Sequence, residues 1–281
     1  MSELYGGLDL SNLDGVTPEE RDAFHTFYET RFGHRHRGLE FLLENRVDVL
    51  KRFRQYVRVG YDSPSAVDRP YSFGFLAYYA LLGYDVGVRY QVRTRQLQGM
   101  TKSQCLDGIA IASLEIGPLG METVAIALDD YQWLAPVQSL AVPVEWDPSH
   151  KAFDSGLDYS SPNLSATEFE KVQRWYLQWL GELPPYVDFL GRHLPNVLKS
   201  YRNRFENCVH ELPKQAVPYT LLHFNVLRGC SGGVRENVLL AKGFGMTKEQ
   251  TLRAIASGME YGSVNNVNLV QEVAGDVLDA W

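Results

Sequence analysis

The stretch GCSGGVREN (residues 229–237) decides the fold of this chain, because a close copy of it, GYDVGVRYQ, occupies residues 83–91. The likeness continues downstream without a gap, and 13 of 28 positions are identical between residues 83–110 and residues 229–256. So many matches at one constant spacing do not arise by chance and indicate an internal repeat. We therefore predict a duplicated unit, with its chemistry where the two copies share a backbone but differ in side chains.

A second pair of similar segments lies upstream and widens the repeat. Residues 41–54 resemble residues 189–202, at a spacing of about 148 residues where the later block has about 146. Between the copies, recurring prolines interrupt any helical pattern. The predicted organisation is an N-terminal helical extension (1–37), a first repeat (38–128), a connecting segment (129–164) and a second repeat (165–281).

Helix-start signals recur along the chain. The segment TPEE (residues 17–20) combines an N-cap threonine, a proline in the first turn and a glutamate that completes a capping box. The same Ser/Thr-x-x-Glu/Gln pattern begins at Thr101, Ser165 and Thr247. No segment has a convincing period-two alternation of the kind that strands show, so we predict an all-α fold. Residues 60–70, rich in Gly, Pro, Ser and Asp, are expected to form a loop.

The composition argues against several classes of partner. The net charge of −7 is unfavourable for binding nucleic acid or an anionic membrane. The sequence contains no apolar run long enough for a membrane span, and its first residues lack the pattern of a signal peptide. Cys105, Cys208 and Cys230 are widely spaced, which suits a reducing compartment better than a disulfide framework. We therefore expect a cytoplasmic protein.

The order of these motifs resembles the carboxymuconolactone decarboxylase and AhpD-like superfamily. The likeness is carried by the Leu-Pro-Pro of residues 183–185, the turn at 229–237, the segment 242–250 and the tail YGSVNNVN at 261–268. That tail is similar to the Tyr-x-Gly-Val-Pro-x-x-Asn segment of the decarboxylases. The resemblance implies two tandem AhpD-like helical units in one compact chain. It also implies a homo-oligomer such as a trimer, because one-unit members of the family often form rings.

The chain departs from the family at the positions that carry its chemistry. The peroxidase branch has a Cys-x-x-Cys pair followed four residues later by a histidine. Here Cys230 falls on the first cysteine, Gly233 on the second and Asn237 on the histidine. A disulfide relay needs two thiols, and asparagine cannot move a proton near pH 7 as histidine does. The resemblance therefore implies the family's pocket without its peroxidase relay.

Four residues are candidates for catalysis, and most have a structural alternative. Cys230 stands at a predicted helix start, where a thiol pKa is lowered, or it is a small packing residue. Glu236 has no acidic counterpart in the first copy and could transfer protons or be plain surface charge. His223 lies seven residues before Cys230 and could replace the missing histidine or be a core residue. Asn237, together with Asn265, would stabilise an enolate-like intermediate.

The expected substrate-binding residues lie in the same repeat. Arg235, like its counterpart Arg89, could clamp a carboxylate with two hydrogen bonds or form an ion pair within the fold. Asn265 and Asn266 could bind a developing oxyanion or cap a helix break. The set is completed by Tyr219 and Tyr261. No His-x-x-x-His or His-Glu-x-x-His spacing occurs, so we expect no metal. Gly-rich phosphate loops are lacking too, and we expect no other cofactor.

These residues favour a cofactor-free lyase or isomerase that acts on a small carboxylated ring or lactone, similar to the carboxymuconolactone decarboxylases. In this hypothesis Arg235 holds the carboxylate, and His223 or Glu236 moves the proton. A second hypothesis is a single-cysteine, thiol-dependent hydroperoxide reductase that uses Cys230. A third is a non-catalytic small-molecule-binding or assembly protein, because a fold does not fix its function. The second repeat has the richer polar set and is expected to hold the site.

Overall fold

The structure is a computed structural model that describes residues 6–33, 35–60, 67–136, 138–146 and 153–281. The described residues form thirteen α-helices and contain no β-strand, which confirms the predicted all-α class. The chain divides into two compact units, residues 1–66 and residues 67–281. The predicted repeat boundaries after residues 37, 128 and 164 stay predictions, because a division into compact units does not show whether a segment is duplicated.

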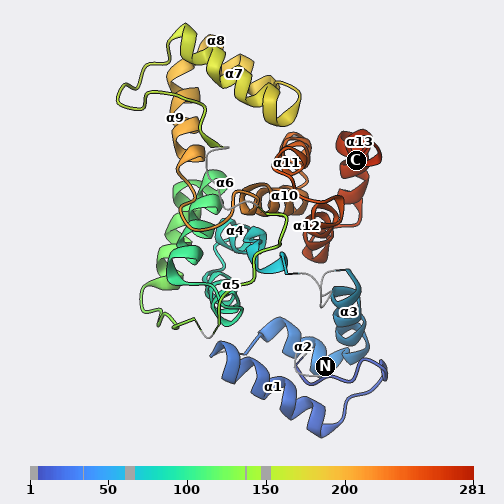
Figure 1. The fold of residues 1–281 in the computed structure, drawn as a ribbon. Helices are drawn as coiled ribbons and strands as arrows, with labels where there is room; N and C mark the ends of the chain where they lie inside the picture. Colours follow the sequence, from blue (N-terminus) through green and yellow to red (C-terminus); the bar gives the residue numbers. More distant parts are fainter. Residues whose placement is uncertain (1–5, 34, 61–66, 137, 147–152) are drawn as a thin grey trace. The chain divides into compact units, whose positions relative to one another are not determined.

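The first unit contains three helices: α1 (Pro18–Phe32), α2 (Arg37–Asn45) and α3 (Val47–Gly60) (Figure 1). The predicted capping box at the start of α1 is present, since Thr17 accepts from the Glu20 N–H and Glu20 accepts from the Thr17 N–H. Lys51 of α3 is fully buried and donates to Glu20 Oε1 at 2.7 Å. This contact ties α3 to the first turn of α1. Of the predicted loop at 60–70, residues 61–66 lie outside the described residues.

The second unit is built around α10. Residues 216–227 of this helix are all buried, and it contacts α4, α6, α11, α12 and α13 (Figure 1). A helix buried on every side belongs to the core of a large domain. The unit comprises a 3₁₀ turn η2 (Arg69–Tyr71) and the helices α4 (Gly74–Leu81), α5 (Asp85–Leu97), α6 (Lys102–Leu128), α7 (Ala166–Leu180), α8 (Pro185–His193), α9 (Pro195–Glu206), α10 (Ala216–Arg228), α11 (Ser231–Gly243), α12 (Lys248–Tyr261) and α13 (Asn265–Asp279). The predicted capping boxes at Thr101, Ser165 and Thr247 are confirmed.

Helix α6 is interrupted at Gly117, whose φ of 63° and ψ of −170° are not helical. Pro118 follows and has no N–H to continue the hydrogen-bond ladder. Among the described helices, α6 is the one long and apolar enough to cross a membrane by length and composition alone, a test that core helices also pass. Much of α6 packs against α4 and α5 within the unit.

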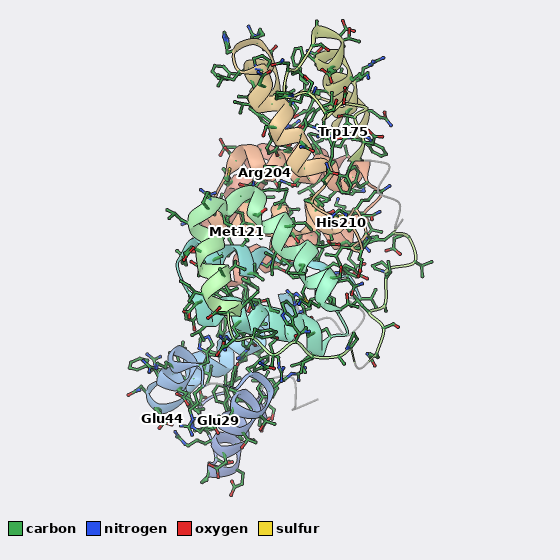
Figure 2. All side chains as sticks on the ribbon, turned by 90° about the vertical axis from the view of Figure 1, so that its left-hand side faces the viewer. Glu29, Glu44, Met121, Trp175, Arg204 and His210 are labelled. Atoms are coloured by element: carbon green, nitrogen blue, oxygen red, sulfur yellow. The ribbon has the colours of Figure 1, made fainter. Side chains whose placement is uncertain are left out.

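Polar contacts fix the connection from α9 to α10 against α6. Asp107 Oδ2 accepts three backbone N–H groups, from His210 at 3.0 Å, Glu211 at 2.6 Å and Leu212 at 2.9 Å. Arg204 of α9 donates to the Ser113 carbonyl at 2.7 Å. Figure 2 labels Arg204 and His210. The contacts hold α9 beside α6, and both helices contribute residues to the pocket described below.

Matching contacts recur in the chain at the predicted repeat spacing. Lys199 of α9 donates to Glu168 Oε1 at 2.7 Å, as Lys51 of α3 does to Glu20. Glu168 also completes the capping box of α7, as Glu20 does for α1. A duplicated unit would contain such pairs. The duplication itself stays a prediction, and its predicted first repeat, which begins at residue 38, leaves α1 outside.

Candidate functional site

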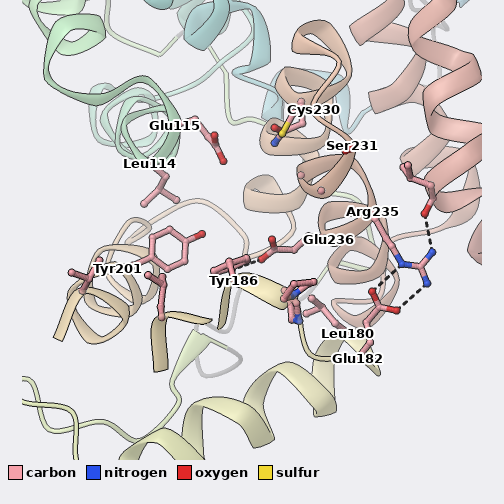
Figure 3. Close-up of a pocket in the computed structure, with 18 residues that line it drawn as sticks. Leu114, Glu115, Leu180, Glu182, Tyr186, Tyr201, Cys230, Ser231, Arg235 and Glu236 are labelled. Carbon is pink, nitrogen blue, oxygen red and sulfur yellow. Dashed lines mark hydrogen bonds and ion pairs between the residues drawn. The ribbon is translucent and has the colours of Figure 1, made fainter. Parts of the chain in front are cut away.

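A pocket of about 660 Å³ lies in the second unit and is lined from α6, α7, α8, α9, α10, α11 and α13 (Figure 3). Its volume is within the range of small-molecule sites. Most of its wall is apolar and includes Leu114, Leu180, Leu190, Val197 and Val273. The polar groups of the wall are Glu115, Glu182, Tyr186, Tyr201, Asn225, Cys230, Ser231, Arg235 and Glu236. The pocket therefore combines an apolar interior with a small set of convergent polar side chains.

The turn between α10 and α11 places three of the predicted site residues. Gly229 ends α10 in the left-handed region, with φ 66° and ψ 37°, a conformation that glycine adopts without steric cost. Cys230 is then the N-cap residue of α11, and Arg235 and Glu236 follow in the helix. Across the pocket, Pro185 begins α8 and puts Tyr186 in the first turn of that helix.

A chain of hydrogen bonds ends at Glu236. The Tyr186 hydroxyl donates to Glu236 Oε1 at 2.8 Å (Figure 3). The Tyr176 hydroxyl lies 2.8 Å from the Tyr186 hydroxyl. Tyr176 is buried in α7, so the chain begins in the core and ends at the pocket wall. The ring of Tyr201 packs edge-on against the Tyr186 ring, with centroids 6.0 Å apart. The Glu236 carboxyl is therefore held in a fixed orientation.

Two carboxyls of the pocket wall, Glu115 and Glu236, are easier to protonate than ordinary glutamates. Burial raises the pKa of Glu236 to about 7, and the charge of Glu115 adds to the rise, while the Tyr186 hydrogen bond and Arg202 oppose it. Burial also raises the pKa of Glu115, against the opposing effects of Arg228 and Asn225. A carboxyl with a pKa near 7 is populated in both protonation states at neutral pH. Glu236 therefore has the property that a general acid/base requires.

Asn225 brings an unsatisfied acceptor to the pocket wall. It is only 1% exposed, and its Nδ2 donates to the Leu221 carbonyl at 2.8 Å. Its Oδ1 has no hydrogen-bond partner among the described groups. A side chain at Gly233 would collide with this amide, since an added Cβ would lie 2.4 Å from Asn225 Oδ1. A buried acceptor without a partner in a pocket is a point where a ligand donor gains a hydrogen bond without displacing a protein group.

Arg235 lines the pocket, but all its donors are used. Its guanidinium makes two hydrogen bonds to Glu182 at 2.9 Å each and one to the Val273 carbonyl at 2.8 Å (Figure 3). It makes two more to Asp276, at 3.0 and 3.4 Å. A guanidinium has five N–H groups, and these five bonds account for them all. The two carboxylates also raise the pKa of Arg235. The arginine joins α11 to α13 and to the turn before α8.

The corresponding arginine in the first predicted repeat has the same role. Arg89 donates to the Ala127 carbonyl at 2.9 Å and forms an ion pair with Asp130. These two partners lie 146 residues before the Val273 and Asp276 partners of Arg235. The sequence left two roles open for these arginines, a clamp for a substrate carboxylate and an ion pair within the fold. Both arginines form the ion pair.

His223 does not line the pocket, so of the two alternatives that the sequence left open it takes the core position and not the catalytic one. It is fully buried in α10, where its Nδ1 lies 2.7 Å from Ser72 Oγ and its ring packs edge-on against Phe75. Burial, and then the nearby charge of Arg95, lowers the pKa of His223 to about 3. The imidazole is therefore neutral near pH 7 and belongs to the core. The apolar sequence of α10 produces a helix that is buried on every side, so His223 is surrounded by core residues and not by the pocket.

The three predicted asparagines also lie outside the pocket lining. Asn237 is 4% exposed and donates to the Gly233 carbonyl one turn earlier at 2.8 Å. Asn266 donates to the Val226 carbonyl at 2.6 Å and so caps the end of α10. Asn265 is exposed, and its backbone N–H donates to Ser263 Oγ. Asn266 thus caps α10 rather than the break in its own helix segment, which was the alternative that the sequence offered.

The two predicted tyrosines are placed apart from the pocket. Tyr219 is fully buried in α10, with its ring 6.1 Å from that of Trp146. Tyr261 is 45% exposed and packs edge-on against Phe75 at 4.8 Å. Of the predicted site residues, the structure thus brings together in the pocket only Cys230, Arg235 and Glu236.

Cys230 is exposed at the N-terminus of α11, whereas Cys105 and Cys208 are buried. Burial raises the pKa of each of these two thiols to about 12. Cys230 is the only cysteine in the pocket lining. Among the described residues, no group of three or more His, Cys, Asp or Glu side chains could hold a metal ion.

The chain matches no protein-family model, no curated protein and no solved structure. The resemblance to the carboxymuconolactone decarboxylase and AhpD-like superfamily stays an expectation from its motifs.

Sequence reasoning missed Tyr186, Tyr201, Asn225 and the role of Glu115. Two signals pointed to Tyr186 and Glu115. The Leu-Pro-Pro that precedes Tyr186 is one of the family-like motifs, and Glu115 stands opposite Tyr261 at the repeat spacing. At that spacing Asn225 and Cys230 correspond to Tyr79 and Tyr84, whose rings pack 5.4 Å apart. Bulky rings thus stand in the first predicted repeat where the pocket has smaller side chains.

Proposed function

We propose that this protein is a cofactor-free lyase or isomerase that moves protons on a small ring substrate, with Glu236 as its general acid/base. The observation that carries the proposal is the setting of Glu236, a carboxyl in a mostly apolar pocket that Tyr186 holds at 2.8 Å. Its pKa of about 7 suits proton transfer at neutral pH. The resemblance to a superfamily that contains cofactor-free decarboxylases supports the reaction class.

In the proposed reaction, ionised Glu236 takes a proton from a substrate carbon next to an electron-withdrawing group. The electron pair of the broken C–H bond moves into that group, and the Tyr201 hydroxyl, also in the pocket lining, can donate to the oxygen where charge develops. In an isomerase, Glu236 returns the proton to a different carbon. In a lyase, the electron pair expels a leaving group and Glu236 later loses its proton to solvent.

The proposal differs from the expectation from sequence in how the substrate is held. The expected clamp for a substrate carboxylate, Arg235, makes five hydrogen bonds within the protein. The alternative proton carrier, His223, lies in the core. Glu236 therefore takes the acid/base role, and we do not assign a carboxylate clamp. The hydroperoxide reductase keeps one point of support, the exposure of Cys230 in the pocket.

The test is proton exchange in heavy water. The full chain is incubated without added cofactor with a panel of unsaturated cyclic lactones and cyclic ketones. Nuclear magnetic resonance then follows deuterium incorporation and double-bond shifts, and a carbon dioxide assay follows decarboxylation. We expect at least one substrate to exchange, with a rate that rises up to about pH 7 as Glu236 ionises.

The decisive variant is Glu236→Gln, which keeps the shape of the side chain but cannot accept a proton. We expect it to lower the exchange rate by about 10²-fold or more. The matched control is Glu122→Gln, which removes an exposed glutamate of α6 that does not line the pocket. Equal exchange rates in the Glu236→Gln variant and the unmodified protein would exclude Glu236 as the base.

A further inference from the structure

We infer that the pocket selects ligands that carry a protonated amine on a small apolar ring system, and that it discriminates against carboxylates. The inference deepens the proposed function, and it rests on that function only where the ligand is taken to be the substrate. Three acceptors of the wall carry it: the carboxyls of Glu115 and Glu236 and the amide oxygen of Asn225.

The hydrogen-bonding capacity of the wall matches an ammonium group. Such a group has three N–H donors and no acceptor. Asn225 Oδ1 is an acceptor without a partner in a residue that is 1% exposed. Glu236 Oε1 is occupied by the Tyr186 hydroxyl, but a carboxyl has a second oxygen and further lone pairs. A ligand ammonium can therefore gain bonds here without breaking any contact described in the pocket.

No cation of the described pocket lining is left for a ligand carboxylate. Arg235, the one basic side chain in that lining, is saturated by Glu182, Asp276 and the Val273 carbonyl. Arg228 does not line the pocket, and its Nη1 is 4.0 Å from Glu115 Oε2. A ligand carboxylate would instead face Glu115 and Glu236, and like charges at close range repel.

The charge balance next to Glu236 leaves room for a ligand cation. The groups that face it are the hydroxyls of Tyr186, Tyr176 and Tyr201, the carboxyl of Glu115 and the guanidinium of Arg202. Arg202 is fully buried, pairs with Glu206 and stacks on the Trp175 ring at 3.9 Å. It is therefore compensated by its own carboxylate, so Glu236 has no full counter-charge of its own, whereas Glu115 has Arg228 at 4.0 Å.

The apolar wall favours the rest of such a ligand. Leu114, Leu190, Val197 and Val273 present hydrocarbon to the interior. The volume of about 660 Å³ leaves room for a two-ring molecule. A ring system can contact this wall while a short arm carries its amine to the acceptors on α6, α10 and α11.

The experiment compares three probes that share one ring and a similar arm: tryptamine, tryptophol and indole-3-propionate. Isothermal titration calorimetry on the full chain at pH 7.5 measures their dissociation constants. We expect tryptamine to bind at least about tenfold more tightly than tryptophol, and indole-3-propionate to bind most weakly. The Glu115→Gln variant should weaken tryptamine about tenfold and leave tryptophol within about twofold, whereas Glu122→Gln on the same helix should change neither.

Proton release gives a second readout that does not depend on a variant. An ammonium beside Glu236 favours its ionised form, so binding near pH 6.5 should expel a proton, and the observed heat should differ between phosphate and Tris buffers. Equal affinities for tryptamine and tryptophol, tighter binding of indole-3-propionate, or no binding of tryptamine would each overturn the inference. In those cases proton exchange on neutral ring substrates would still test the proposed function separately.

Discussion

The Tyr186 hydroxyl donates a 2.8 Å hydrogen bond to Glu236 Oε1, and the two residues are 50 positions apart in the chain. The bond stabilises the ionised carboxyl, so it works against the burial that raises the Glu236 pKa to about 7. The balance between burial and this hydrogen bond sets the protonation state of the candidate acid/base. The first prediction follows from removing the hydrogen bond.

Tyr186→Phe should raise the pKa of Glu236 further, because the variant keeps the ring but loses the donor. A hydrogen bond to a charged group contributes about 1.5–3 kcal/mol, which corresponds to a rise of about one pKa unit or more. A ¹³C magnetic resonance titration of the glutamate carboxyls measures it, with the signal assigned by its loss in Glu236→Gln. Tyr131→Phe, whose hydroxyl binds Gln96 instead, is the control and should leave the titration unchanged. A Glu236 pKa that does not rise in Tyr186→Phe would contradict the role of this bond.

Glu236 should also make the protein less stable as the pH rises. Its pKa is about 7 in the folded protein against an ordinary value of 4.5, so between these two values the folded state holds a proton that the unfolded chain has released. The free energy of unfolding therefore falls from about pH 4.5 to about pH 7. Glu236→Gln does not titrate, and its stability relative to the unmodified protein should improve by about 3 kcal/mol across that window.

Urea unfolding at pH 4.5 and at pH 8 measures this difference. The other carboxyls titrate in both proteins and cancel in the comparison. If the two stability curves stay parallel, Glu236 does not have a raised pKa in the folded state. A larger gain for the variant at pH 4.5 than at pH 8 would show the opposite shift.

Arg235→Leu should lower the unfolding temperature by a few degrees without weakening ligand binding. The arginine is 32% exposed and binds Glu182 and Asp276, so its loss loosens α11 from α13 but removes no free donor from the pocket. Arg89→Leu is the matched variant, because Arg89 makes the corresponding pair with Asp130. Both variants should show similar shifts in a thermal melt. If only Arg235→Leu lost affinity for indole-3-propionate, Arg235 would be shown to bind the ligand carboxylate after all.

Gly233→Ala and Gly232→Ala form a sharp pair of adjacent substitutions in the first turn of α11. A Cβ at Gly233 would lie 2.4 Å from the Asn225 amide, whereas a Cβ at Gly232 meets nothing within 4 Å. Gly233→Ala should therefore cost about 1–3 kcal/mol of stability and weaken tryptamine binding about tenfold. Gly232→Ala should be neutral or stabilise by up to about 1 kcal/mol, since alanine favours the helix. Similar behaviour of both variants would mean that the position of Asn225 is not critical.

The sequence by itself determined the features that depend on neighbours in the chain. The capping boxes at Thr17, Thr101, Ser165 and Thr247 begin helices as predicted, because an N-cap and its partner three residues later meet within one turn. The all-α class followed from the same local signals. The repeat spacing also led to Glu236, by showing where the second copy departs from the first.

The tertiary structure decided which of these side chains can act. Glu115, Tyr186 and Asn225 reach the pocket from three different helices, and no local pattern reports such a meeting. The donors of Arg235 are occupied by Glu182 and Asp276, which lie 53 and 41 positions away in the chain. His223 is inaccessible because other helices pack around α10. Burial and neighbouring charges set the pKa of Glu236 and decide whether the Arg235 donors are available. Each depends on the sum of many contacts that only the folded chain makes.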